Sequence, residues 1–396
     1  MTRIRPAMFF ACLVLQYQAC FAQEGESASS FPLAGARPSA VASDDPLELD
    51  NLVVAGSTGN SMFGWWPKQL VVAPVPGYSP QLGWSLALGG AWFFNDQSET
   101  DTPPSLLGAF GYASDNGSIA YGAGGSFHLR EDKFRVAAGA GFMDVQYRFY
   151  GVGSEQNKRG LAIDIQQEAP AYFGSFSTRV WSHLYIGLGY LWSDVQTRPK
   201  LSFEDALPDF DPVVEVEMAA LLIPIEWDSR DHSLFPRDGW HIKSNATLYR
   251  ESVGSDFDAT TISLAVNRYI PMRDTDVLAV RGYFRSVSGD APFFLLSSFG
   301  GGTDLRGYPA GRYRDRMMYA LQAEYRWQFH RRWILTGFAG FGEVASDWGE
   351  FGNNLLPAVG TGIRFVLSQE HRMSLSADIS KGQDGYEFYF GVNEAF

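Results

Sequence analysis

The stretch Leu82-Gly83-Trp84-Ser85-Leu86-Ala87-Leu88-Gly89-Gly90-Ala91-Trp92-Phe93-Phe94 alternates between large apolar residues and small ones. Successive side chains of a β-strand point to opposite faces, so a period of two places these two classes on opposite faces. A large apolar face suits lipid and a face of small residues suits a crowded interior, as in a membrane-spanning strand. The large residues are Leu82, Trp84, Leu86, Leu88, Trp92 and Phe94.

The same pattern recurs along the rest of the chain. We expect further strands at about 105–114, 118–130, 133–149, 161–181, 184–196, 213–229, 238–250, 257–270, 276–286, 317–329, 334–345, 356–368, 372–381 and 386–396. With 82–94 this set is odd, whereas a closed antiparallel barrel of this class has an even number of strands. The extra strand lies either at 69–76 or at a turn hidden near Ala169-Pro170. The sequence therefore predicts an all-β fold, a single antiparallel transmembrane β-barrel of about sixteen strands over residues 69–396.

The first 22 residues have the pattern of a secretory signal peptide. A basic start (Arg3, Arg5) precedes an apolar run from Ala7 to Leu15, and small residues precede the expected cleavage after Ala22. The run is far below the ~20 apolar residues that a membrane-spanning helix needs. Residues 23–68 are rich in Ser, Ala, Pro and Gly, so we expect a flexible exported leader there.

Composition narrows the class of protein further. Aromatic residues make up 15% of the chain and glycines number 42, which favours a β-barrel over the rival secreted β-sandwich or β-helix. Both cysteines, Cys12 and Cys20, lie in the expected signal peptide, so no disulfide is expected after cleavage. Loss of Arg3 and Arg5 changes the formal net charge from −13 to −15 (−13 − 2), which argues against nucleic acid as a partner.

No residue pattern of the chain indicates catalysis. The six histidines are scattered, without metal-ligand spacing, and no Gly-x-Ser-x-Gly elbow precedes a helix. The acidic loop at 198–212 could hold Ca²⁺ loosely but lacks an ordered ligand spacing. We expect no catalytic, cofactor or metal site, although a hydrolase that assembles Ser and His across strands would leave no sequence pattern.

The loop expected at 287–316 is the most distinctive segment. It contains Gly300-Gly301-Gly302-Thr303-Asp304-Leu305-Arg306-Gly307-Tyr308-Pro309, and its glycines let the backbone fold closely on itself. On the next strand, residues 319–329, Glu324 belongs to the polar face. Leu305, Arg306, Gly307 and Tyr308, followed by a strand with this Glu, resemble the lid-loop signature of the BamA/TamA-like outer-membrane barrel superfamily. The resemblance implies a lid loop folded into the lumen, with Arg306 bound to Glu324 through its planar fork.

Two other motifs carry the same resemblance. The turn at 230–237 and its flanks are similar to the periplasmic turn of the superfamily, through Asp228, Arg230, Asp231, Pro236 and Gly239. Phe388, Phe390 and Phe396 share one face, like the C-terminal signal that the barrel-assembly machinery reads.

One position departs from the pattern of the superfamily. Relatives carry an Asp on the strand after the Glu strand, and here Gly340 stands in its place. We therefore expect the lid to depend more strongly on Glu324 than it does in relatives.

The expected topology follows from an even strand number with both chain ends in the periplasm. The loops at 198–212 and 287–316 are then extracellular, and the turns at 182–183, 230–237, 271–275, 330–333 and 368–371 are periplasmic. The chain is expected in the outer membrane of a Gram-negative bacterium, in contact with lipid and with the barrel-assembly machinery during biogenesis.

Two functions of different classes remain open. By resemblance, the barrel assists insertion or translocation of a protein or lipid client, with a separate periplasmic partner, since residues 23–68 are too short for the POTRA domains of relatives. The alternative is a plugged pore or structural barrel without insertase activity. A weakly paired seam between the first and last strands would favour client insertion, and a fully bonded seam would favour the alternative.

Overall fold

A computed structural model describes residues 70–79, 82–94, 105–153, 162–200, 213–231, 235–273, 275–300, 304–368, 373–392 and 394–396. The expected signal peptide and leader at 1–68, and most of the acidic loop at 198–212, lie outside these residues. In the described part of the chain, no helix has the length and apolar character needed to cross a membrane.

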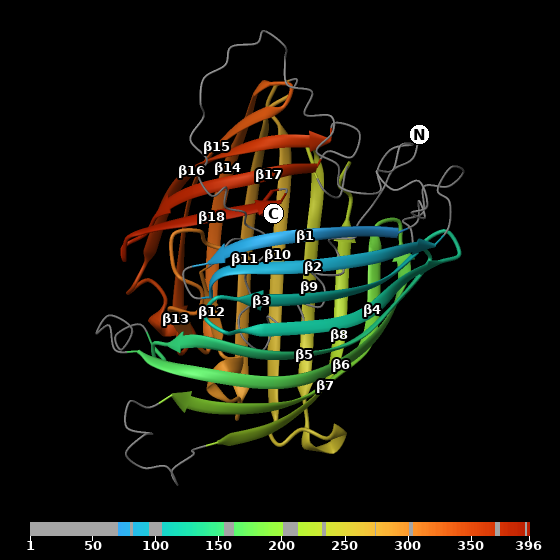
Figure 1. Cartoon of the computed structure of the whole chain (residues 1–396), viewed down its shortest axis with the longest axis vertical. Coiled ribbons are helices and arrows are strands. Elements are labelled where there is room, and N and C mark those ends of the chain that lie inside the picture. The colour runs from blue at the N-terminus through green and yellow to red at the C-terminus, as the bar shows by residue number, and fades with distance from the viewer. Residues whose placement is uncertain are drawn as a thin grey trace.

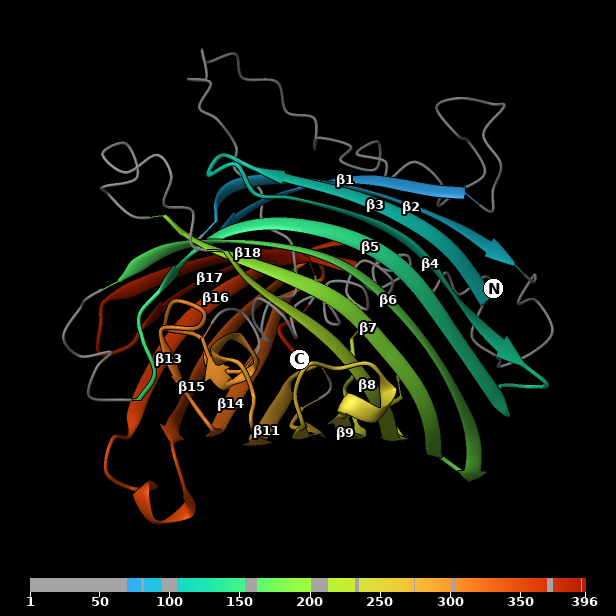
Figure 2. The ribbon, with the colours of Figure 1, turned by 90° about the horizontal axis from the view of Figure 1, so that it is seen from below.

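Long antiparallel strands form one continuous sheet that curves around a common interior (Figures 1 and 2). Its order follows the chain from β1 to β11 and then from β14 to β18. The first strands are β1 Leu70–Ser79, β2 Gly83–Phe94, β3 Ser105–Ser114, β4 Ile119–Leu129, β5 Phe134–Phe149, β6 Ile163–Trp181, β7 Leu184–Lys200 and β8 Val214–Asp228. The others are β9 Gly239–Tyr249, β10 Ala259–Pro271, β11 Val277–Gly289, β14 Met317–His330, β15 Trp333–Ala345, β16 Leu356–Ser368, β17 Met373–Lys381 and β18 Tyr386–Val392.

Each strand places one set of side chains outward and the other inward, as the alternation in the sequence predicts. In β2, Leu86 and Leu88 are more than half exposed, whereas Ala91 is buried. In β14, Trp327 points outward, and the polar residues Gln322, Glu324 and Arg326 are buried on the interior face. The all-β, antiparallel architecture is confirmed, with an apolar outer surface and polar groups inside.

The two positions considered for an extra strand have different outcomes. Leu70–Ser79 forms β1, which pairs along its whole length with β2. Ala169 and Pro170 lie within the uninterrupted strand β6, so the chain does not turn there.

The sheet begins at β1 and ends at β18, and these two strands lie next to each other (Figure 1). Some of their Cα atoms approach within 8 Å. Among the described residues of the two strands, no ladder joins them. Closure of the sheet into a barrel thus stays a prediction, and we call this boundary the seam.

The lid loop connects β11 to β14 and crosses the interior of the sheet. It contains a 3₁₀ turn, Phe293–Leu295, and a short hairpin of β12 Ser297–Phe299 with β13 Tyr313–Asp315. Phe294 and Leu295 join an apolar cluster with interior residues of β3 to β10. Leu305 and Tyr308 join a second cluster, with β14 to β16. This burial holds the loop inside the sheet.

Candidate functional site

The Leu305-Arg306-Gly307-Tyr308 element lies deep in the interior. Leu305, Arg306 and Tyr308 are each 0% exposed. Gly307 has a φ of 126°, and a Cβ there would lie 3.0 Å from Cβ of Ala358 and 3.2 Å from the backbone N of Gly382. Only glycine combines this φ with so close an approach to β16 and the β17–β18 turn. Gly307 therefore allows the backbone to approach the strands closely, and this approach sets the position of Arg306 beside it.

Arg306 binds two carboxylates at once. Its Nη2 lies 2.6 Å from Oε2 of Glu324 in β14, and its Nη1 lies 2.6 Å from Oδ2 of Asp378 in β17. The guanidinium also stacks 3.5 Å from the centre of the Phe338 ring in β15. A planar guanidinium suits such a site because its donors diverge in one plane while its face packs on an aromatic ring.

The structure thus brings Arg306 and Glu324 together, but it revises the expectation that the lid depends more strongly on Glu324 than it does in relatives, because Arg306 has a second carboxylate partner. Asp378 supplies the second carboxylate from β17, two strands farther along the sheet than Gly340. A Cβ at Gly340 would lie 2.4 Å from the backbone O of Leu321 and 3.0 Å from Cδ1 of Leu305. The lid leucine therefore occupies the space that a side chain at 340 would need.

Arg306 belongs to a buried network of three arginines and three carboxylates. Arg326 Nε lies 2.7 Å from Glu324 Oε1, and Arg364 Nε lies 2.9 Å from Glu394 Oε2. Arg364 also binds Asp378. Through these contacts each buried ion has a neighbour of opposite sign, and the formal charges of the six side chains cancel. The attraction between neighbours offsets the cost of removing the ions from water.

Sequence reasoning missed Asp378, Arg364 and Glu394 as members of this network. For Asp378 and Arg364 the available signal was the polar face of their strands, since Asp378 alternates with apolar residues in 373–381. The alternation predicts that an acid points inward. It does not tell which arginine lies opposite.

The lid loop has a second set of contacts with the last hairpin of the sheet. The backbone N–H of Gly307 donates to Tyr389 Oη in β18 at 3.0 Å. At the turn after β17, Asp384 accepts hydrogen bonds from Arg312 Nε at 3.1 Å and Tyr313 Oη at 2.9 Å. The lid loop is therefore bonded to β18, one of the two strands at the seam.

The turn motif between β8 and β9 closes on itself. Arg230 binds Asp228 through Nε and Nη2, both at 2.8 Å. Asp231 Oδ1 accepts from the backbone N–H of Arg237 at 2.9 Å, and Gly239 begins β9. Pro236 is buried. These contacts hold the described residues of the turn in place.

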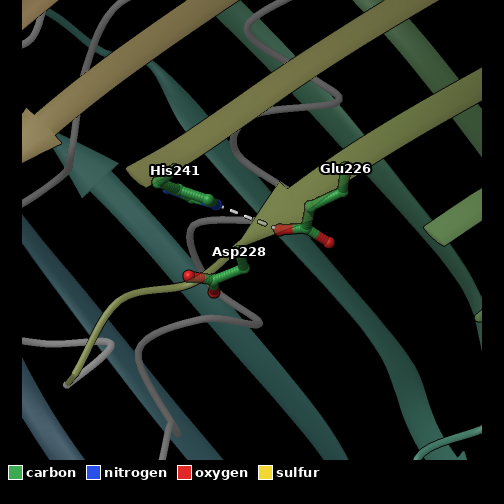
Figure 3. A group of neighbouring side chains, drawn as sticks. All are labelled: Glu226, Asp228 and His241. Carbon is green, nitrogen blue, oxygen red and sulfur yellow. Dashed lines mark hydrogen bonds and ion pairs between the residues drawn. The ribbon is translucent and has the colours of Figure 1, made fainter. Parts of the chain in front are cut away.

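Beside this turn, Glu226, Asp228 and His241 bring three potential metal-ligand atoms within 4.8 Å of one another (Figure 3). Their spacing in the sequence shows no sign of this cluster, because β8 and β9 bring its members together. Glu226 already has Arg135 Nη1 at 2.9 Å and Lys243 Nζ at 3.6 Å. With Arg230 on Asp228, three cations face the two carboxylates of the cluster, so their negative charge is compensated by side chains of the protein.

Arg135 links this cluster to the turn between β4 and β5. There Asp132 accepts from Arg135 Nη2 at 2.7 Å and from Tyr185 Oη at 2.7 Å, and it lies 2.6 Å from His128 Nδ1. Burial opposes ionisation of Asp132, but the hydrogen bonds from these three side chains outweigh it. The pKa of Asp132 is therefore lower than its ordinary value.

The expectation of a strand reaching Phe396 is wrong, because β18 ends at Val392. Phe388 is half exposed on the outer face, whereas Phe396 packs inside against Tyr269, Val277 and Ala279. The interior holds these last residues because Arg326 donates to the Phe396 main-chain oxygen at 2.8 Å and Glu394 binds Arg364. The side chain of Phe390 lies outside the described part of the chain.

Comparisons with known proteins agree with this architecture. The Omp85 superfamily domain matches residues 215–396. Of the solved structures, BamA from Haemophilus ducreyi lacking POTRA domains 1–3 is 14% identical with a TM-score of 0.59, over 82% of this chain and 70% of that one. CdiB from Escherichia coli is 13% identical with a TM-score of 0.57, over 84% of this chain and 64% of that one.

CdiB from Acinetobacter baumannii is 12% identical with a TM-score of 0.50, over 82% of this chain and 59% of that one. The chain thus spans less than two thirds of either CdiB. A comparison with curated proteins gave no match. The sequence motifs, the BamA-like fold and the matched domain lead to one conclusion: residues 215–396 of this chain are similar to the Omp85 superfamily domain.

Proposed function

We propose that this chain is a sixteen-stranded outer-membrane β-barrel that assists the insertion or translocation of a protein or lipid client through its seam. The observation that carries the proposal is the seam itself. β1 and β18 approach within 8 Å, yet within the described residues the sheet order ends at each of them without a ladder between them.

A seam without a ladder between the described residues of β1 and β18 has a physical consequence in a membrane. Each backbone N–H or C=O group that faces hydrocarbon without a hydrogen-bond partner raises the free energy of the folded protein by roughly several kcal/mol. A strand edge in this state is a template for another strand. A client strand at the seam would satisfy these groups, which gives the edge a use that a fully bonded barrel lacks.

The comparisons support this proposal at the level of the family. Insertases and secretion pores occur among the barrels that the sequence motifs resemble, and BamA and CdiB share the fold. The partners that follow are outer-membrane lipid, the barrel-assembly machinery during biogenesis and a client or periplasmic protein. The proposal includes no covalent chemistry, so the chain would act without a cofactor.

One observation favours the alternative of a plugged pore or structural barrel. The lid loop fills part of the interior and is fixed there by buried ion pairs, with both Arg306 and Glu324 0% exposed. A barrel that only needs to be blocked would also use such a plug. The two functions differ in whether the seam has to open.

A covalent lock across the seam separates them. Pairs of cysteines, one in β1 and one in β18, are introduced, and the purified protein is placed in liposomes with an unfolded outer-membrane barrel as client. We expect oxidation to slow client folding and reduction to restore it. If the oxidised protein accelerates client folding as well as the reduced one, the seam is not the route. Acceleration in neither state would favour the plugged barrel.

A further inference from the structure

The strand at one side of the seam contains two prolines, Pro74 and Pro76, in the run Leu70–Ser79. Proline has no backbone N–H, so it cannot donate to a neighbouring strand. Both residues nevertheless lie in register with β2, opposite Leu88 and Leu86. The effect of each proline on the sheet depends on whether its nitrogen faces β2 or the seam.

Antiparallel pairing fixes that direction. Along a strand, residues alternate between those whose N–H and C=O point to one neighbour and those that point to the other. A proline can keep its place in the ladder with β2 only where its nitrogen points away from β2. Pro74 and Pro76 are two residues apart, so their nitrogens point to the same side of β1, away from β2. The residues of β1 that face the seam are therefore Leu70, Val72, Pro74, Pro76 and Tyr78.

The same rule is visible elsewhere in this sheet. Pro170 in β6 pairs with Phe142 of β5, but the ladder to β7 is interrupted there, between Glu168↔Gln196 and Ala171↔Ser193. Pro224 in β8 likewise pairs with Asn245 of β9. Its ladder to β7 is interrupted between Ile186↔Ile225 and Gly189↔Leu222. Each interior proline keeps one ladder and interrupts the other.

The strand on the opposite side of the seam, β18, has only seven residues. β18 ends at Val392, and the residues beyond it are held in the interior by Glu394, whose carboxylate lies 2.9 Å from Arg364 Nε and 3.5 Å from Arg326 Nε. These residues therefore do not extend β18 along the seam.

We infer that Pro74 and Pro76 keep the seam from completing a ladder and leave a stretch of β1 that can accept hydrogen bonds but not donate them at those two residues. The partner that fits such an edge is an extended β-strand that gives its own N–H groups to the carbonyls of β1. Because that strand receives fewer bonds in return, it can also leave. The identity of the partner rests on the proposed function, whereas the effect of the prolines on the seam does not.

The test restores the two donors. In the variant Pro74→Val with Pro76→Val, two N–H groups would face β18, and valine also favours strand conformation. Hydrogen–deuterium exchange of the full chain in nanodiscs is followed in peptides covering 70–79 and 386–392. Two added hydrogen bonds are expected to slow exchange in β18 by roughly tenfold or more.

The matched control is Pro170→Val, which adds a donor at an interior ladder far from the seam. It should slow exchange only around β6 and β7. Unchanged exchange of β18 in the double variant, with the protein folded by its heat-modified mobility, would overturn the inference. Slowed exchange of 386–392 in the Pro170→Val control would do the same, because the effect would then be general stabilisation.

Client folding in liposomes then separates this inference from the proposed function. If the double variant slows seam exchange and also slows client folding, both stand. If seam exchange slows and client folding does not change, the prolines weaken the seam but the seam is not the client route. In that case the proposed function fails and the inference survives.

Discussion

Arg306 is the residue at which the lid loop meets the wall of the sheet. Its two carboxylate partners come from β14 and β17, so one guanidinium ties the loop to strands on both sides of β15 and β16. Such a buried pair adds little net stability, since desolvation offsets attraction. Removing one partner is costly nevertheless, because without Arg306 the network holds three carboxylates and two arginines, so one buried negative charge is no longer compensated.

Arg306→Ala is expected to release the lid loop at a cost of about 3–5 kcal/mol, the usual penalty for breaking a buried ion pair. Glu324→Ala should act in the same direction, and the double variant should be no worse than the more severe single one. Limited proteolysis between Gly300 and Arg316 and noise in bilayer conductance measure the release. The control is Arg316→Ala, an exposed arginine in the same loop. Wild-type cleavage and conductance in both single variants would show that the pair does not hold the lid.

Gly307→Ala tests the close approach rather than the charge. The added Cβ would face Ala358 at 3.0 Å with a φ of 126°, so we expect a loss of more than about 1 kcal/mol and displacement of Arg306. Gly352→Ala is the matched control, because Gly352 has a φ of 99° but nothing within 4 Å. Thermal unfolding of both variants separates backbone strain from steric conflict. Equal destabilisation by the two substitutions would contradict a specific role for Gly307.

Among the elements, the turn between β4 and β5 shows how a short connection joins distant strands. Asp132 accepts from Tyr185 of β7, and Arg135 at the start of β5 reaches Glu226 of β8. The β4–β5 turn and the strands β5, β7 and β8 thus share one chain of charge-assisted hydrogen bonds at one end of the sheet.

The pH dependence of this turn follows from the lowered pKa of Asp132. A carboxyl whose pKa is lower in the folded state than its ordinary value of 3.8 stabilises the fold above that pH, and the contribution is lost as pH falls toward the folded pKa. Asp132→Asn should therefore unfold at a lower temperature than wild type at pH 7, with a smaller difference at pH 3. Asp164→Asn, at an exposed pair with Arg148, is the control. A difference that does not depend on pH would rule out ionised Asp132 as the cause.

For the whole molecule, the topology makes a prediction about the two sides of the membrane. A tag after Asp209, in the acidic loop outside the described residues, is expected to bind antibody on intact cells. A tag after Arg331, in the β14–β15 turn, is expected to bind only after the outer membrane is opened. The opposite pattern would reverse the orientation of the sheet.

The sequence by itself determined the strands and their faces. Period-two alternation is a local property, so it is enough to assign 82–94 and 317–329 as strands with an outer and an inner side. Alternation also places Glu324 on the inner face, whereas its pairing with Arg306 was implied by the resemblance to the BamA/TamA-like superfamily. The end of the last strand could not be predicted from alternation. β18 stops at Val392 because Arg326 and Arg364 hold the residues after it in the interior.

The tertiary structure decided which inward residues meet. Asp378 joins Arg306, and Glu394 joins Arg364, because the curvature of the sheet and the path of the lid loop bring them together. Glu226, Asp228 and His241 became neighbours for the same reason, through the register of β8 and β9. Alternation specifies a face but not an opposite partner across the interior, since partners depend on register and curvature summed over many strands. The seam, too, is a relation between the two ends of the sheet, which only the folded chain sets side by side.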